Sequence, residues 1–183
     1  MPAGGDKILI TDYSAVASAS LTKPLVRLIQ TVAQSIPNGT TTITALTFTT
    51  ETIDTDAFFN AGTSTTKVTP NKPGYYRVRG VYNPVGALTY AWVGSFIRKN
   101  GSGGTLLPPA SRMGGGDSIG NFSTTQAAVP SISAECEVIV DMNGTTDYVE
   151  LCVSQANTAS AAQLTVVGNQ FASVFEVEYL RGL

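Results

Sequence analysis

The chain has 183 residues and a formal net charge of −2, and charged residues make up 13% of it, about half the share usual in soluble domains. This balance provides no basic stripe for nucleic acid, and no apolar run approaches the roughly 18 residues that a membrane-spanning helix needs. The sequence contains no histidine, which excludes Ser-His-Asp and Cys-His catalysis and histidine-ligated metal sites.

The first segment, 1–24, is a polar leader whose apolar side chains are Ile8, Leu9 and Ile10, with Tyr13 close by. It lacks the basic start and long apolar block of a secretory signal, so we expect synthesis in the cytoplasm. A leader of this kind frays when nothing binds it. We therefore interpret it as a docking arm on a neighbouring subunit; the alternative is an arm folded against its own domain.

The remainder, 25–183, has the pattern of an all-β protein. Segments with a two-residue periodicity or a β-branched composition follow one another every ten to fifteen residues, roughly, with turn signals between them. The expected strands lie at 25–36, 40–48, 65–69, 75–82, 88–99, 119–129, 133–142, 148–155, 161–167 and 171–180. This pattern predicts one sandwich or jelly-roll domain of about ten antiparallel strands, preceded by an extended N-terminal arm.

The strand at the centre of the chain alternates cleanly. Tyr76, Val78 and Tyr82 share one face, and Arg77 and Arg79 share the other. A period of two places the first set in the core and the arginines in solvent.

The segment 88–99 is apolar on both faces. Tyr90, Trp92 and Phe96 have the same parity, while Val93 and Ile97 have the opposite one. Such a strand is either central in the sandwich, or its second face meets another chain.

Two Asn-Gly pairs, at Asn100 and Asn143, mark tight turns. The Gly- and Pro-rich stretch 102–120 is expected to be a long exposed loop. Its three consecutive glycines do not form a phosphate loop, because no Lys-Ser/Thr pair follows them.

The two cysteines, Cys136 and Cys152, are expected to be reduced. Cys136 has the parity of the apolar Val138 and Val140, whereas Cys152 has the parity opposite to Leu151. If their strands are neighbours in a hairpin, the two sulfur atoms point to different faces, and a disulfide fails on geometry.

Acidic residues offer two candidate functional sites, and for each of them a purely structural role is the favoured interpretation. Asp54 and Asp56, with Glu51, supply oxygen ligands of the kind that calcium prefers, but their spacing does not match an EF-hand loop, and a polar loop is the favoured interpretation.

Paired carboxylates of the glycosidase type are the second candidate. The pairs Glu135 with Glu137 and Glu176 with Glu178 fall on outer strand faces with no sign of a groove. We therefore expect no enzymatic activity and no cofactor.

Several short motifs, in their order along the chain, resemble the jelly-roll superfamily of tumour necrosis factor and the complement globular head. Gly74, Tyr76 and Val78 are similar to the Gly-x-Tyr-x-Phe strand of that family, with Val in place of Phe. The segment 147–155 resembles its Gly-Asp-x-Val-x-Leu strand, although Thr146 replaces the Gly. The resemblance spans about 25–183.

This resemblance implies a jelly roll that assembles as a compact homotrimer, with aromatic side chains of neighbouring protomers around the threefold axis. The candidates for such an interface are Tyr82, Tyr90, Trp92, Phe96 and Tyr179. The alternative for each is a place in the ordinary core of the sandwich.

Within the superfamily, the combination of a short leader with this head is most similar to bacteriophage virion proteins. The resemblance implies a structural protein at the virion surface, made in the host cytoplasm, whose arm binds other virion proteins and whose head serves as capsid decoration or a head fibre. The alternative is a tail-tip or tail-fibre knob that recognises host-surface glycans. A more distant option is a cellular adhesion or lectin module.

Overall fold

The computed structural model describes residues 23–85, 90–101, 104, 107, 133–168 and 171–183. Every regular element in these ranges is a strand, and none is a helix, so none is a helix that could span a membrane. The strands are β1 (Leu25–Ile29), β2 (Ser35–Ile36), β3 (Gly39–Ala45), β4 (Thr50–Asp54), β5 (Phe59–Asn60), β6 (Ser64–Val68), β7 (Pro73–Tyr82), β8 (Tyr90–Lys99), β9 (Ala134–Asn143), β10 (Val149–Asn157), β11 (Gln163–Leu164) and β12 (Val174–Arg181).

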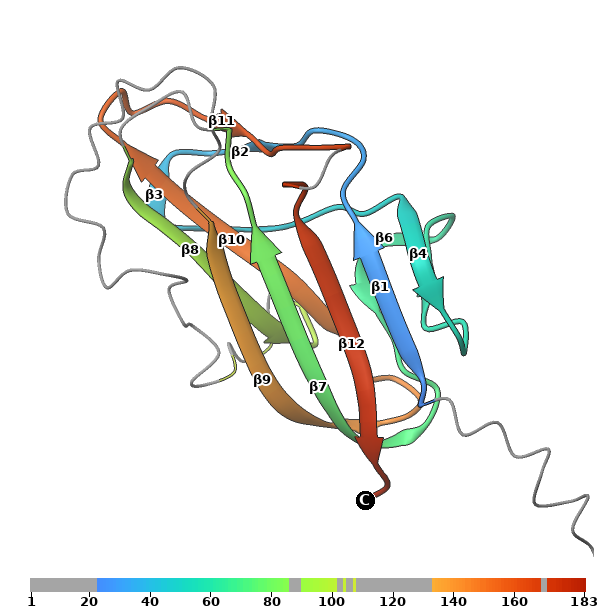
Figure 1. Ribbon diagram of the computed structural model, residues 1–183. Coiled ribbons are helices and arrows are strands. Elements are labelled where there is room, and N and C mark those ends of the chain that lie inside the picture. The colour runs from blue at the N-terminus through green and yellow to red at the C-terminus, as the bar shows by residue number, and fades with distance from the viewer. Residues whose placement is uncertain (1–22, 86–89, 102–103, 105–106, 108–132, 169–170) are drawn as a thin grey trace, which may run out of the picture.

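The strands form two facing antiparallel sheets and a small third one (Figure 1). The larger sheet has the order β4-β1-β12-β7-β9, and the sheet opposite has the order β5-β6-β10-β8. The pair β11-β2 lies across one end of the molecule. This arrangement confirms the expected all-β jelly roll.

The alternation of β7 is realised as the sequence predicts. Tyr76, Val78 and Tyr82 are buried between the sheets, and Arg77 and Arg79 are exposed on the outer face. The Tyr76 hydroxyl donates a hydrogen bond of 2.8 Å to the Lys72 carbonyl, so its polar end is satisfied at the rim of the core.

Glycine at position 74 is required by a close approach of backbone and ring. A Cβ atom there would lie 2.5 Å from the Arg181 carbonyl oxygen and 2.5 Å from the Tyr179 ring. The first position of the Gly-x-Tyr-x-Val motif is therefore fixed by the packing of β7 against β12.

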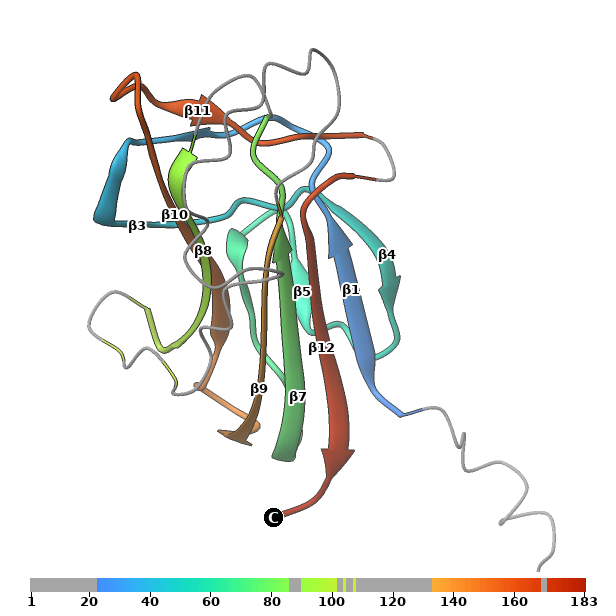
Figure 2. The ribbon, with the colours of Figure 1, turned by 60° about the vertical axis from the view of Figure 1, so that its left-hand side comes forward.

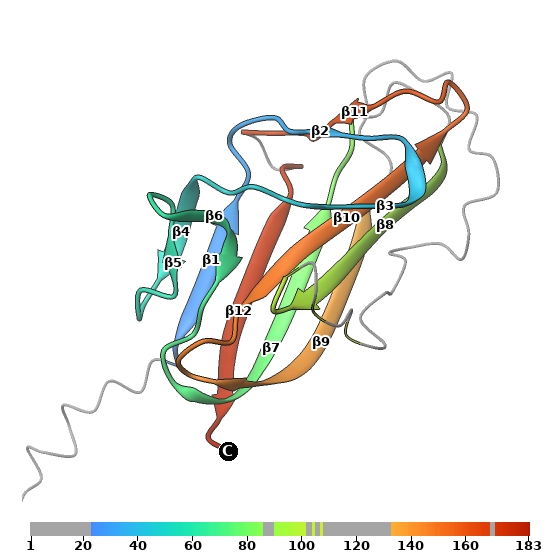
Figure 3. The same cartoon turned by 180° about the vertical axis from the view of Figure 1, so that it is seen from behind.

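Both described ends of the chain lie at one end of the sandwich (Figures 1 and 2). The backbone N–H of Tyr179, near the C-terminus, donates to the carbonyl of Pro24, just before β1, over 2.8 Å. The segments around β2 and β11 lie at the opposite end, which Figure 3 shows from behind.

The sequence-based expectation failed where strands stop early. The segment 25–36 was expected to form one strand, but β1 ends at Ile29, and the side chain of Val32 is exposed. The last two expected strands, at 161–167 and 171–180, are not neighbours: β11 pairs with β2, while β12 lies between β1 and β7.

A bulge moves Tyr90 to a different face. The pairing of β8 with β10 shifts between Ala156 and Asn157, so Asn157 faces Tyr90 while Ala156 faces Trp92. Tyr90 therefore enters the core, and its hydroxyl donates to the Val85 carbonyl over 2.6 Å.

The turn between β9 and β10 connects the two sheets and does not form a hairpin within one sheet. The premise used for the cysteines was therefore wrong, yet the expectation of reduced thiols is confirmed, because Cys136 and Cys152 are both free and buried. The expected strand at 119–129 and most of the loop at 102–120 lie outside the described residues.

Candidate functional site

The outer face of the five-stranded sheet carries a ladder of charged side chains. Strand register places Arg27, Glu176, Arg79 and Glu137 side by side on β1, β12, β7 and β9. Glu176 forms an ion pair with Arg27, whose Nε lies 3.2 Å from Oε1, and its Oε2 lies 3.8 Å from Arg79 Nη1. Opposite charges on directly paired positions stabilise neighbouring strands by a few tenths of a kcal/mol, roughly.

Two further ion pairs extend the ladder. Arg77 pairs with Glu178, and Arg79 pairs with Glu135. The hydrogen bond to Glu135 raises the pKa of Arg79 above its ordinary value. Arg27, Arg77 and Arg79 therefore each have a carboxylate partner on a neighbouring strand.

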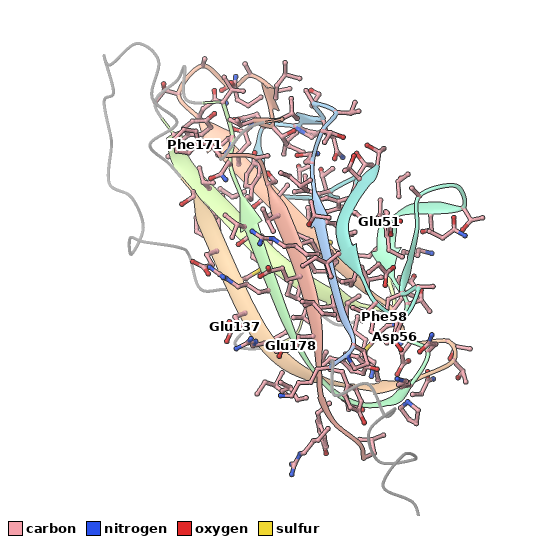
Figure 4. All side chains as sticks on the ribbon, turned by 45° about the vertical axis from the view of Figure 1, so that its right-hand side comes forward. Glu51, Asp56, Phe58, Glu137, Phe171 and Glu178 are labelled. Carbon is pink, nitrogen blue, oxygen red and sulfur yellow. The ribbon has the colours of Figure 1, made fainter. Side chains whose placement is uncertain are left out.

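A hollow of about 330 Å³ opens in the middle of this face. It is lined by Leu25, Arg77, Arg79, Glu137, Glu176 and Glu178. Figure 4 shows Glu137 and Glu178 close to each other on this side. The prediction that no groove lies beside these glutamates was wrong for Glu137, Glu176 and Glu178. The alternation of residues along a strand predicts which face of the sheet a side chain occupies, but it does not predict whether the surface of that face is hollowed.

The charged side chains that line the hollow are two arginines and three glutamates. Glu137 has no ion pair among the described residues. The hollow is therefore a mixed-charge surface with one surplus negative charge.

The acidic loop singled out for calcium has a structural use. Asp54 Oδ1 accepts the backbone N–H of Asp56 at 3.3 Å and of Phe58 at 3.0 Å, and Oδ2 accepts that of Phe59 at 2.9 Å. These bonds shape the turn that leads Phe58 into the core.

Asp56, the second acid of this loop, is held by neighbouring donors. Hydrogen bonds from Thr55 and Lys72 hold the pKa of its carboxyl below the ordinary value. Within the described residues, no three potential ligands gather as a metal site would require. The described contacts of Asp54 and Asp56 are therefore contacts within the protein.

A second polar cluster, which the sequence did not single out, joins the two Asn-Gly turns. Lys99 Nζ lies 3.0 Å from Asp147 Oδ2, and Asn100 Nδ2 donates to Asp147 Oδ1 over 3.0 Å. Asn143 Oδ1 accepts the backbone N–H groups of residues 145–147. The turn residues Asn100 and Gly101 both have positive φ, which confirms the predicted tight turn.

The five aromatic interface candidates separate into two groups. Tyr82 and Tyr90 are 0% exposed, so they have no surface left to offer a second chain. Trp92, Phe96 and Tyr179 are partly exposed. The first two bracket Gly94 on the outer side of β8, and Trp92 Nε1 donates to Ser154 Oγ over 2.8 Å. Tyr179 packs against Tyr76, with ring centroids 5.3 Å apart.

Neither thiol is an accessible nucleophile. Burial raises the pKa of Cys136 to about 11 and that of Cys152 to about 12. The thiolate is the reactive form, so both groups are inert near neutral pH. The proposed contacts of the arm, Ile8, Leu9, Ile10 and Tyr13, lie outside the described residues.

Comparison with solved structures shows the fold. Murine APRIL at pH 5.0 superposes with a TM-score of 0.55 at 13% identity, covering 87% of this chain and 100% of that one. Murine APRIL at pH 8.5 gives 0.51 at 13% identity, with 86% and 99% covered. The globular domain of zebrafish complement 1qA gives 0.48 at 13% identity, with 88% and 100% covered. No family model and no curated protein matches the sequence.

Proposed function

We propose that this chain is a structural virion protein, a trimeric surface knob anchored by its N-terminal arm, with capsid decoration or a head fibre as its role. The observation that carries the proposal is the position of the chain ends. Pro24, from which the arm departs, is hydrogen-bonded to Tyr179 near the C-terminus. An anchor at this end leaves the whole opposite end of the sandwich free to project outward (Figure 1).

The charged groups support a structural role. The ladder on the outer sheet face and the Lys99–Asp147 cluster use their charges in contacts between strands and turns. Histidine is absent from the chain, and both thiols are buried. A protein that binds and assembles, without catalysis, fits these features.

Trimer formation through the outer side of β8 is the second part of the proposal. Trp92 and Phe96 are large aromatic side chains that remain partly exposed, and burial of such side chains dominates interface energetics. Ile139, which is 62% exposed on β9, marks the other sheet as the competing interface. The substitution Phe96→Asp is expected to dissociate the trimer and Ile139→Asp to leave it intact; the reverse result would move the interface to the five-stranded sheet.

A receptor-binding knob at the tail tip or on a tail fibre is the second candidate function. The observation that favours it is an uncharged end of the sandwich, opposite the chain ends, which is described below. Decoration proteins occur in many copies on a particle and tail knobs in few, so copy number separates the two.

The experiment is quantitative mass spectrometry of purified particles, calibrated with labelled peptides of this chain. Dozens of copies or more, roughly, would support decoration, and a handful would support the tail knob. Absence from particles would reject both. For the arm, a chain lacking residues 1–24 is expected to lose particle binding, and undiminished binding would reject anchoring.

A further inference from the structure

Among the described residues, the segments that form the end of the sandwich away from the chain ends carry no charged side chain. We call this region the distal end and define it by the described residues of 30–49, 82–85 and 152–173. None of these residues is Asp, Glu, Lys or Arg. The rows of ion pairs all lie on the other side, starting with Arg79 and Glu135.

Three chain segments meet at the distal end through hydrogen bonds of their backbones. Val85 N–H donates to the Leu164 carbonyl over 2.9 Å, and Val166 N–H donates to Asn83 over 2.9 Å. Gln34 and Thr165 exchange bonds of 3.0 Å. These contacts join segments that are far apart in the sequence into one continuous surface.

Two glutamine side chains, the half-buried Gln34 and the fully buried Gln155, support this surface. Gln34 Oε1 accepts the backbone N–H of Thr47 at 2.8 Å, and its Nε2 donates to Ala45 over 2.9 Å. Gln155 Nε2 donates to Ile36 at 3.1 Å and to Ala161 at 3.2 Å. These bonds tie the segments around Gln34, Ile36, Ala45 and Ala161 together, so the distal end is a hydrogen-bonded platform.

Apolar side chains are exposed on this platform. Four of the seven large hydrophobic side chains that are exposed in the described residues belong to the distal end: Val32, Val85, Leu164 and Phe171. Leu164 and Val85 lie on adjacent hydrogen-bonded segments, and Phe171 lies at the same end in Figure 4. The surrounding residues are mainly Thr, Ser, Asn, Gln and Ala.

This chemistry selects the class of partner. A charged ligand would lose hydration here without meeting a counter-charge, which is unfavourable. The core of a protein interface is enriched in large aromatic side chains, whereas the exposed residues here are mainly Thr, Ser and Ala around four apolar side chains, of which one is aromatic. A neutral carbohydrate also presents apolar and hydroxyl groups side by side. Its C–H faces pack on aliphatic and aromatic side chains, and its hydroxyl groups form hydrogen bonds with amides and hydroxyls.

We propose that the distal end binds neutral, uncharged glycans. The proposal deepens the receptor-binding alternative, because it rests on a knob whose distal end faces outward. Binding is expected to be independent of ionic strength, since no charge pair contributes.

The test uses the full-length protein on a printed array of neutral glucans, mannans and galactans beside sialylated and sulfated glycans. Retention on neutral glycans is expected, with a change of less than about twofold between low and high salt. The substitution Leu164→Asp adds a charge at the centre of the platform and is expected to weaken binding about tenfold or more. The control Ile53→Asp changes a comparably exposed side chain on β4 and should leave binding unchanged.

Three outcomes would overturn the proposal: no neutral glycan retained, preference for sialylated or sulfated glycans, or equal loss in both variants. Association beyond a trimer that Leu164→Asp removes would assign the distal end to a second copy instead. Because the array uses purified protein, its failure is distinct from absence of the protein on particles. If the protein is folded, trimeric and present on virions but binds no glycan on the array, the glycan-binding inference is rejected and the proposed virion function is not.

Discussion

Gly80 of β7 lies directly against Leu151 of β10, where the two sheets approach each other. A Cβ atom at position 80 would be 2.3 Å from Leu151 Cδ1 and 2.9 Å from Cδ2. Leu151 is fully buried, so its side chain has no open space into which it can move. The two sheets are thus held at a separation that a single added methyl group disturbs.

The substitution Gly80→Ala is expected to lower the free energy of unfolding by about 1–3 kcal/mol, because overpacking forces neighbouring groups to shift. Urea unfolding followed by tryptophan fluorescence measures the loss. Gly62→Ala is the control, because its nearest neighbour is the Asn60 side chain at 3.2 Å in an exposed turn. Equal stability of the Gly80→Ala variant and the wild type would contradict the close contact.

Asp54 is predicted to stabilise the turn after β4 without metal. Asp54→Ala removes the acceptor for three backbone N–H groups and should cost about 1–3 kcal/mol, whereas Asp54→Asn keeps one acceptor oxygen and should cost less. Thermal unfolding in EDTA and in calcium measures both variants. A wild-type stabilisation by calcium that Asp54→Ala abolishes would show that the loop binds the ion after all.

Asp147 is predicted to contribute to acid sensitivity. Desolvation acts to raise the pKa of its carboxyl, but hydrogen bonds from Asn100, Lys99 and the Asn143 backbone outweigh it, so the pKa lies below its ordinary value. A carboxyl with a lowered folded pKa stabilises the protein above its unfolded pKa, and the contribution is lost as pH falls through the folded pKa.

Chemical unfolding at a series of pH values below about 5 measures this contribution. The wild type is expected to lose stability steeply on acidification, and Asp147→Asn should show a lower stability at neutral pH with a shallower decline. An unchanged slope in the variant would mean that the cluster linking Lys99 and Asp147 is not maintained in solution.

The two cysteines are predicted to be unreactive in the folded protein. Burial raises the pKa of Cys136 to about 11 and of Cys152 to about 12, so thiolate is scarce at pH 8. An aromatic disulfide reagent should therefore release no colour from the native chain and two equivalents in denaturant, matching the two free thiols. Rapid labelling of either thiol in the native state would contradict its burial.

The sequence was sufficient for the fold class because its strongest signals come from strands with one buried face. In β7 the parity of Tyr76 and Arg77 follows directly from the two-sided environment of an antiparallel sheet. Asn100 likewise identified its turn, since an Asn-Gly pair adopts positive φ at low cost.

The failures come from features that periodicity does not encode. The bulge opposite Asn157 reverses the face of Tyr90. The turn after β9 has the sequence of a hairpin turn, but it leads to β10 in the other sheet. The hollow beside Glu137 and Glu178 is formed by side chains from several neighbouring strands, so the pattern of any one strand does not predict it. The uncharged distal end, in contrast, had a clear sequence signal, because the runs 28–50, 80–97 and 151–175 contain no charged residue.

The most direct test of the central claim is the native mass of the full-length protein, measured by native mass spectrometry and by sedimentation equilibrium at micromolar concentration. The account predicts a single species of about 57 kDa, three times the chain mass of 19.1 kDa. A protein that remains at 19.1 kDa over the whole concentration range would contradict the trimeric knob.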